Sequence, residues 1–239
     1  MPHPRSAEFS SAWEHASNIA GWLTEDQAEL LWEASTDLPD ESVVVEIGSH
    51  QGRSTTVLAA AVRDRHGRVV AIDPFVDGRL FGGTKTRDIF ERNIEAAGAT
   101  DVVELLAEYS TQARPGWSTP IDYLYIDGKH DYWTLSDDLK WSEHLPIGGP
   151  VLIHDCYSSI GVTLGVLAHV LPSRRLVYER RAGSLALFRV GRPTRRDRLR
   201  IVAELPWWLR NVAVKVLLRL RLRPVAARVF GHDSPYDPY

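Results

Sequence analysis

Four acidic residues at the ends of short apolar runs are the first candidates for chemistry. Glu46, Asp73, Asp127 and Asp155 stand in the segments VVVEI, RVVAID, IDYLYID and PVLIHD. If these segments are parallel strands, their carboxyl ends share one rim of the sheet, and ligands bind at that rim in open α/β sheets. We therefore expect four carboxylates around one crevice, which suits a ligand with cationic or hydroxyl groups.

The loop after the first run indicates what this ligand is. Gly48, Ser49 and Gly52 give the spacing GxxxG, whereas dinucleotide-binding loops have GxGxxG. In a dinucleotide site Glu46 would also lie close to a pyrophosphate, which its charge disfavours. S-adenosylmethionine (SAM) has no phosphate, and its amino, sulfonium and ribose groups are partners for carboxylates, so SAM fits this loop better.

Two histidines beside these acids are candidates for proton transfer. His130 lies in IDGKHDY and His154 in LIHDC. A histidine can take the proton of a reacting hydroxyl, and a divalent cation can lower the pKa of that hydroxyl. We expect His130 or His154 to take the proton while Asp127 and Asp155 position the acceptor. Lys129 is a further candidate base if burial lowers its pKa.

Cys156, the single cysteine, excludes an intrachain disulfide. A cysteine nucleophile assisted by His154 is disfavoured, because adjacent residues of a strand point to opposite faces. The N-terminal residues MPHPRSAEF lack the apolar run of a signal peptide. We therefore expect a cytoplasmic protein.

The elements that must position these residues alternate between strands and helices. Strand candidates cover 43–47, 68–73, 102–107, 121–127 and 150–155, and runs at 174–181 and 184–190 flank Ala182-Gly183. The glycine favours an antiparallel hairpin, and the alternation favours parallel βαβ units. The sequence thus predicts an α/β fold with a Rossmann-like seven-stranded, mostly parallel sheet, an antiparallel C-terminal hairpin and helices on both faces.

Three regions are expected along the 239 residues. Residues 1–40 form an N-terminal helical segment, with a helical pattern over 8–38 and Thr24 as an N-cap, and the part through Trp22 is a candidate lid. Residues 41–192 form the SAM-binding core. Residues 193–239 form a basic amphipathic extension, and the glycine-rich loop 77–86 is a second mobile candidate.

The extension has an unusual charge balance. From Arg189 to Arg228 there are twelve arginines and lysines against only Asp197 and Glu204. A helix that begins near Pro206 is too charged to span a membrane. We expect it to pack in a homodimer through the apolar side chains of Trp207, Trp208, Val214, Leu217 and Leu218. Peripheral contact with anionic lipid is the second expectation, and the acidic crevice argues against a nucleic-acid substrate.

Four segments, taken in order, carry a family resemblance: VEIGSHQGRST, VVAIDPF, IDYLYIDGKHDY and LPIGGPVLIHDCY. They resemble class I SAM-dependent methyltransferases, in particular the small-molecule O-methyltransferases that include macrolide-sugar and aminocoumarin-sugar enzymes. The resemblance covers about Gly21 to Val190. It implies that the cofactor is bound by Glu46, Gly48, Ser49, Gly52, Ser54, Asp73, Ser110 and Asp127.

The same resemblance implies a divalent metal, Mg²⁺ or Mn²⁺, on Asp127, His154 and Asp155. In the similar enzymes the first Asp of a DGD motif and a later Asp-Asp pair bind the metal, and the second Asp of DGD is the base. Here His154 replaces one acid of the pair and Lys129 stands at the base position. Because Mg²⁺ prefers oxygen ligands, this departure weakens the case for Mg²⁺ relative to Mn²⁺.

The acceptor implied by the resemblance is a sugar hydroxyl, for example on a mannoside or a precursor of a methylated polysaccharide of mycobacterial type. Trp22, Tyr132, Trp133 and Tyr157 are expected near the crevice, and such aromatic walls suit a sugar ring or a flat phenol equally. A phenolic natural product is therefore an alternative acceptor, and a SAM-binding protein without catalysis is an alternative function.

Overall fold

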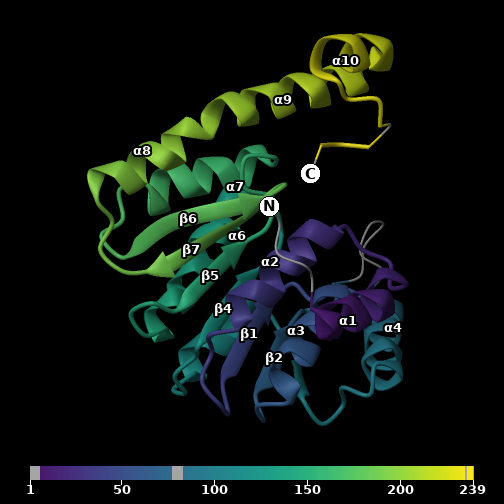
Figure 1. The fold of residues 1–239 in the computed structure, drawn as a ribbon, viewed down its shortest axis with the longest axis vertical. Helices are drawn as coiled ribbons and strands as arrows, with labels where there is room; N and C mark the ends of the chain where they lie inside the picture. Colours follow the sequence, from purple (N-terminus) through teal and green to yellow (C-terminus); the bar gives the residue numbers. More distant parts are fainter. Residues whose placement is uncertain (1–5, 77–82, 235, 239) are drawn as a thin grey trace.

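A seven-stranded sheet forms the centre of the molecule in the computed structural model, which describes residues 6–76, 83–234 and 236–238. The strand order is β3-β2-β1-β4-β5-β7-β6, and all neighbours are parallel except at β7, which runs antiparallel to both β5 and β6 (Figure 1). The strands are β1 Val43–Ile47, β2 Arg68–Ile72, β3 Val103–Leu106, β4 Tyr123–Ile126, β5 Pro150–Ile153, β6 Leu176–Ala182 and β7 Leu185–Val190. The predicted fold class is thus confirmed.

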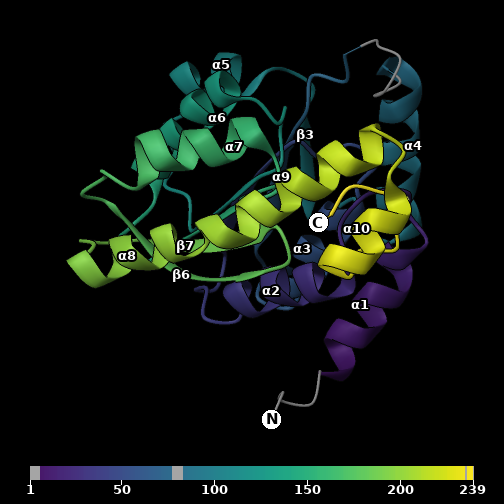
Figure 2. The same cartoon turned by 90° about the horizontal axis from the view of Figure 1, so that it is seen from above.

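The first five strands lie within their predicted ranges. The apolar runs of β1, β2, β4 and β5 are buried on both faces of the sheet, whereas β3, at the edge, is only partly buried. Val44 packs with helices on one face, and its neighbour Val45 packs on the other. The helices are α1 Ala7–Ser17, α2 Glu25–Ser35, α3 Arg53–Arg63, α4 Gly83–Ala96, α5 Ser110–Ala113, α6 Tyr132–Asp138 and α7 Ile160–Gly165, with short turns at 114–116, 139–144 and 166–170. Helices α1 to α4 cover the first face, and α5 to α7 cover the other (Figure 2).

The N-terminal region contains two helices where the sequence pattern suggested helical structure throughout 8–38. Residues 18–24 separate α1 from α2. Thr24 caps α2 as predicted: its hydroxyl accepts the backbone N–H of Gln27, and the Gln27 side chain accepts the N–H of Thr24. Both helices contribute buried side chains to the core, including Phe9 and Leu31. Most of the loop predicted to be mobile, residues 77–82, lies outside the described residues.

The C-terminal extension packs onto the core. Helices α8 Arg195–Ala203 and α9 Leu205–Arg219 form one nearly continuous rod beside the edge strand β6, and α10 Arg223–Phe230 follows (Figure 1). Ile201 belongs to the same buried cluster as the sheet residues. In the part of the chain that the structure describes, no helix has both the length and the apolar character that a membrane crossing needs.

The side chains on which the dimer prediction rested are largely turned inward. The Trp207 ring lies 3.9 Å from the guanidinium of Arg181, Trp208 packs against the core, and Val214 is fully buried. These contacts are formed within one chain. The homodimer remains a prediction, but these three side chains do not support it, because sequence periodicity does not say which apolar side of the helix meets the sheet.

Candidate active site

Four backbone hydrogen bonds extend the parallel ladder one residue past the strand ends. The donors are the N–H groups of Asp73 to Leu106 O (3.2 Å), Gly48 to Ile72 O (2.8 Å), Asp127 to Ile47 O (2.8 Å) and His154 to Ile126 O (2.9 Å). Each donor is the first residue after its strand. Gly48, Asp73, Asp127 and His154 therefore stand side by side on the carboxyl rim, as the sequence predicted.

Gly48 allows two loops of this rim to meet. Its φ is +92°, and a Cβ at this position would lie 2.1 Å from the carbonyl oxygen of Asp127. Only glycine fits such an approach, because a side chain would overlap the neighbouring backbone. The loop after β1 and the loop after β4 are thus in direct contact.

Backbone strain gathers on the same rim. His50, Phe75, Asp155 and Tyr157 are non-glycine residues with φ between +45° and +59°. Each such conformation costs on the order of 1 kcal/mol or more and persists only where its surroundings enforce it. These residues lie in the loops after β1, β2 and β5. Their conformations indicate that the backbone of these loops is held in a shape that the site requires.

Glu46 does not join the other carboxylates, so the expected crevice has three acids rather than four. Its side chain is fully buried under the start of α3, where it accepts hydrogen bonds from the hydroxyls of Ser54 (2.5 Å) and Thr55. Burial raises the pKa of Glu46 to about 7, although the hydroxyls act in the opposite direction. In this structure Glu46 and Ser54 tie α3 to β1, and their predicted contact with a cofactor stays a prediction.

Asp73 is held by backbone donors from two loops. Its carboxylate accepts the N–H of His50 (2.9 Å) and the N–H of Phe75 (2.8 Å), and the side chain is half-buried. A carboxylate fixed in this way at the end of β2 is oriented in advance for a diol. This geometry fits the predicted role of Asp73 toward a ribose.

Asp127, His130 and Asp155 form a compact group beside Gly48, which we call the acid–histidine group. The Nδ1 atom of His130 lies 2.7 Å from Oδ2 of Asp155, and its Nε2 atom lies 3.7 Å from Oδ1 of Asp127. One potential ligand atom from each of the three residues lies within 4.8 Å of the other two. His154, which the sequence assigned to a metal together with these two acids, also faces them: its Nδ1 lies 3.3 Å from Oδ1 of Asp127 and 3.7 Å from Oδ2 of Asp155. Its role as a ligand stays a prediction.

Charge governs protonation within this group. Burial alone would lower the pKa of His130, but the carboxylates of Asp127 and Asp155 outweigh it and raise this pKa to about 10. Burial likewise opposes ionisation of Asp155, yet His130 and His154 hold the pKa of that carboxyl well below its usual range. Without a cation, His130 is therefore an imidazolium at neutral pH.

His154 is oriented by Gln27, a residue that the sequence analysis missed. The buried Nε2 of His154 lies 3.2 Å from Oε1 of Gln27, which also accepts the N–H of Thr24 (2.9 Å). The amide nitrogen of Gln27 donates to Ser184 (3.1 Å). Because Oε1 is thereby an acceptor, the proton of His154 belongs on Nε2, and Nδ1 faces Asp127 Oδ1 at 3.3 Å. The capping pattern Thr24-x-x-Gln27 was the one signal for this residue.

Lys129 and Ser110 have other partners. The side chain of Lys129 is 79% exposed and its ammonium lies 3.1 Å from Asp131, so the structure does not bring Lys129 into the acid–histidine group. The hydroxyl of Ser110 donates to Asp138, and burial raises the pKa of that carboxyl to about 6. The second oxygen of Asp138 is buried without a hydrogen-bond partner among the described residues.

The predicted aromatic residues divide into two sets. Trp22 is 53% exposed, and its ring lies 5.5 Å from the His50 ring on the loop after β1. Trp133 is 76% exposed and contacts Tyr132. Tyr157 is instead fully buried and packs in the core. Two exposed tryptophans thus flank the rim, whereas Tyr157 supports it from below.

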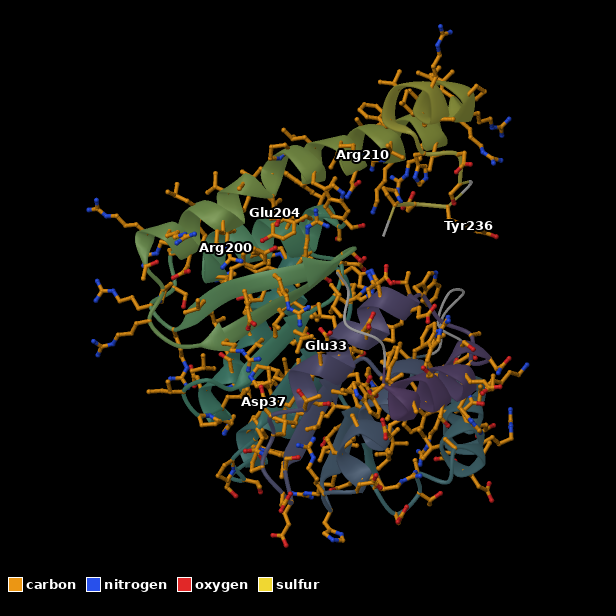
Figure 3. The ribbon with its side chains drawn as sticks, in the orientation of Figure 1. Glu33, Asp37, Arg200, Glu204, Arg210 and Tyr236 are labelled. Carbon is orange, nitrogen blue, oxygen red and sulfur yellow. The ribbon has the colours of Figure 1, made fainter. Side chains whose placement is uncertain are left out.

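The C-terminal extension also reaches this rim. The Asn211 side chain of α9 donates to the carbonyl of Tyr157 (3.0 Å), and Ser158 donates to the carbonyl of Pro238 (2.8 Å). Tyr236, in the same tail, is 74% exposed (Figure 3). The sequence analysis treated the extension as separate and gave no signal for these contacts, which lie within a few residues of Asp155.

The chemistry of the donors fits a divalent cation between Asp127, His130 and Asp155. Oδ1 of Asp155 and Nδ1 of His154 are buried and make no hydrogen bond within the described part of the chain, while Oδ2 of Asp155 is paired with His130. Two carboxylates with one imidazole suit a borderline ion such as Mn²⁺ better than Mg²⁺. SAM fits the neighbouring loop. Gly48 leaves the backbone of this loop open to a ligand, and Asp73 supplies a carboxylate that backbone donors hold in place. SAM contains no phosphate, so the loop does not need a phosphate-binding site.

A family model described as a methyltransferase domain matches residues 45–156. This range begins in β1 and ends just after Asp155, so it contains the Gly48 loop, Asp73 and the acid–histidine group. The seven-stranded sheet with its antiparallel C-terminal hairpin is the Rossmann-like methyltransferase fold.

Solved structures of methyltransferases share this fold. An O-methyltransferase from Bacillus cereus in complex with S-adenosylhomocysteine (SAH) is 20% identical, with 79% of this chain and 92% of that chain covered and a TM-score of 0.56. A Podospora anserina methyltransferase bound to SAH is 14% identical, with coverage of 79% and 90% and a TM-score of 0.59. An rRNA methylase from Streptococcus thermophilus is 17% identical, with coverage of 73% and 99% and a TM-score of 0.52. At these identities the likeness shows the fold.

Proposed function

We propose that this protein is a SAM-dependent O-methyltransferase that methylates a hydroxyl of a small molecule. The observation that carries the proposal is the contact between the Gly48 loop and Asp127. It joins the loop suited to the methyl donor to the acid–histidine group suited to the acceptor. The matched methyltransferase domain covers both parts.

The acid–histidine group would orient the acceptor and receive its proton. A divalent cation, when bound there, would lower the pKa of the acceptor hydroxyl and compensate the carboxylate charges. Asp127 and Asp155 would hold this cation together with one of the two histidines, and Gln27 would keep His154 in one orientation. The histidine that does not bind the cation would accept the proton, because neither an imidazolium nor a metal-bound imidazole has a free lone pair.

We propose a sugar hydroxyl as the acceptor, on a mannoside or a precursor of a methylated polysaccharide. The support is the sequence resemblance to sugar O-methyltransferases together with Trp22 and Trp133, two exposed aromatic faces beside the rim. Stacking on such faces suits a sugar ring. A phenol would use the same faces, so an acceptor panel must contain both classes.

Transfer of a labelled methyl group from SAM tests the activity. Purified protein is assayed with mannosides, other sugars and catechols, in the presence of Mn²⁺, Mg²⁺ or EDTA. We expect transfer to at least one sugar that EDTA abolishes and Mn²⁺ restores. Transfer only to catechols would refute the sugar proposal. Tight SAH binding without transfer to any acceptor would favour a non-catalytic SAM-binding protein.

Variants assign the residues of the site. Asp155→Asn should abolish transfer by removing a ligand charge, whereas Asp131→Asn, a change in a helix cap outside the group, should leave most of it. Equal activity of both variants would refute the assignment.

A further inference from the structure

The outer side of the α8–α9 rod presents a continuous apolar stripe. The side chains are Leu199 (67% exposed), Val202 (41%), Leu209 (61%), Val216 (51%) and Leu220 (63%). Their spacings of three, seven, seven and four residues place them on one face of a helix. The opposite face meets the core through Ile201, Trp208 and Val214. We call these five outward residues the outer stripe.

Helix α10 adds to this apolar surface. Val225 is 41% exposed and Val229 is 62% exposed, and Leu222, just before the helix, is 41% exposed. Single exposed apolar residues are ordinary, but a stripe that continues along successive helices indicates an interaction surface.

Cations accompany the outer stripe, and the two acids of the rod, Asp197 and Glu204, are already engaged. Several exposed arginines of this segment have no ion-pair partner among the described residues, among them Arg192, Arg195, Arg219, Arg221 and Arg228. Asp197 accepts the N–H and the hydroxyl of Thr194 at the helix cap. Glu204 lies on the side of the rod that faces β6, where it binds Tyr178 (2.7 Å) and Arg181 (2.8 Å) (Figure 3). The rod and the residues that flank it are therefore both apolar and strongly positive.

We propose that the outer stripe and its arginines dock on an anionic lipid surface, with the α8–α9 rod parallel to the membrane plane. Apolar side chains at the headgroup boundary and flanking arginines against anionic lipids are the two sources of affinity for an interfacial helix. The rest of the chain carries an excess of acid, since the net charge is −3 despite this segment. A negative surface would therefore attract this side selectively.

Charge also argues against a second copy of the chain or a nucleic acid as the partner of the outer stripe. In a twofold dimer through this face, the same patch would meet itself, and its unpaired arginines would be brought together. A nucleic acid would match the arginines but would leave the leucines and valines against phosphates. A lipid surface satisfies the apolar and the cationic groups together.

Docking in this orientation would place the candidate active site near the lipid. Asn211, on the inner side of α9, binds the backbone of Tyr157, two residues after Asp155. One helix thus separates the proposed docking face from the rim of the sheet.

Sedimentation with sucrose-loaded vesicles tests the proposal on the full chain. Vesicles of phosphatidylcholine with about 30% phosphatidylglycerol are compared with pure phosphatidylcholine at low and high salt. We expect binding to the anionic vesicles only, weakened by salt. Replacing Arg219, Arg221 and Arg228 by Gln should weaken binding roughly 100-fold, since each interfacial cation contributes about fivefold.

Matched variants separate the two sources of affinity. Leu209→Gln, Val216→Gln and Leu220→Gln together should weaken binding at least about tenfold, whereas Ile147→Gln, a change at an 88% exposed residue before β5, should have no effect. Lys85→Gln, Arg87→Gln and Arg92→Gln on α4 remove the same charge elsewhere and should also leave binding unchanged.

Four results would overturn the proposal. One is a folded wild-type protein that does not sediment with anionic vesicles at low salt. Another is wild-type binding in the triple variant of the outer stripe. The third is a wild-type dimer in analytical ultracentrifugation that this variant converts to a monomer, which would assign the face to a second copy. The last is displacement of vesicles by a short RNA that binds more tightly, which would assign the face to nucleic acid.

Discussion

Replacement of the buried Glu46 by Gln should remove a large pH dependence from the stability of the protein. The carboxyl is fully buried, and its pKa rises from 4.5 in the unfolded chain to about 7 in the folded one. Between these values the folded state binds a proton that the unfolded state has released. The unfolding free energy must therefore fall as pH rises through this window.

The expected magnitude follows from the two pKa values. Each pH unit within the window corresponds to about 1.4 kcal/mol, so ionisation of Glu46 costs the wild type about 3 kcal/mol between pH 4.5 and 7. The amide of the Glu46→Gln variant would be neutral throughout and can still pair with the hydroxyls of Ser54 and Thr55. The difference in unfolding free energy between the variant and the wild type should thus shift by about 3 kcal/mol in favour of the variant as pH rises across this window.

Urea unfolding at about pH 5.0 and about pH 7.5, near the two ends of this window, measures the difference. Subtracting the wild-type value from that of Glu46→Gln cancels the other titrating groups, including Asp138. Glu95→Gln, a change at an exposed position on α4, is the control and should show a difference that is nearly independent of pH. If the difference for Glu46→Gln is also the same at both pH values, Glu46 is already ionised at the lower pH in the folded protein and the reasoning is refuted.

Three further predictions concern the rim and the core. Gly48→Ala should destabilise the protein by about 3 kcal/mol or more in urea unfolding, because its Cβ would meet the Asp127 carbonyl. Gly148→Ala, with a similar φ of +89° but no atom within 4 Å of the Cβ, should cost only about 1 kcal/mol, and an equal cost for both would contradict the close approach. Gln27→Met should weaken Mn²⁺ binding roughly 10- to 100-fold in calorimetry by releasing His154, and unchanged affinity would remove Gln27 from the site. Arg65→Met should lower stability by about 2 kcal/mol, because the guanidinium caps carbonyls at the end of α2, and Arg92→Met should not.

The sequence predicts the sheet and its rim well because the signals are local. Apolar runs fix the strands, and the residue after each run is the residue at the rim. Asp73, Asp127 and Asp155 are therefore found from the strand pattern alone. The hairpin of β6 and β7 follows from the glycine turn between two apolar runs in the same way.

The direction of Glu46 is not predictable by this reasoning. All five residues of β1 are buried, so no alternation of polar and apolar residues shows which face each side chain takes. The packing of α3 decides it by placing Ser54 and Thr55 over the carboxylate. Similarly, α9 is apolar on both sides, and only contact with Arg181 and the core shows that Trp207 and Trp208 face inward.

Contacts between distant segments account for the remaining differences. Gln27 and His154 are 127 positions apart in sequence, and no local pattern links them. His130 enters the acid–histidine group because the loop after β4 turns toward Asp155. The charge of Lys129 is satisfied by Asp131 on the same loop, which removes it from the group.

Calorimetric titration with S-adenosylhomocysteine tests the central claim most directly. We expect wild-type protein to bind it and Asp73→Asn to bind at least about tenfold more weakly, because the carboxylate held by His50 and Phe75 would receive the ribose hydroxyls. Asp122→Asn is the matched control, since Asp122 also accepts a backbone N–H, from Val43, but at the other end of the sheet. Weaker binding by Asp73→Asn alone is the predicted result. No binding by folded wild-type protein would contradict the proposed methyltransferase function.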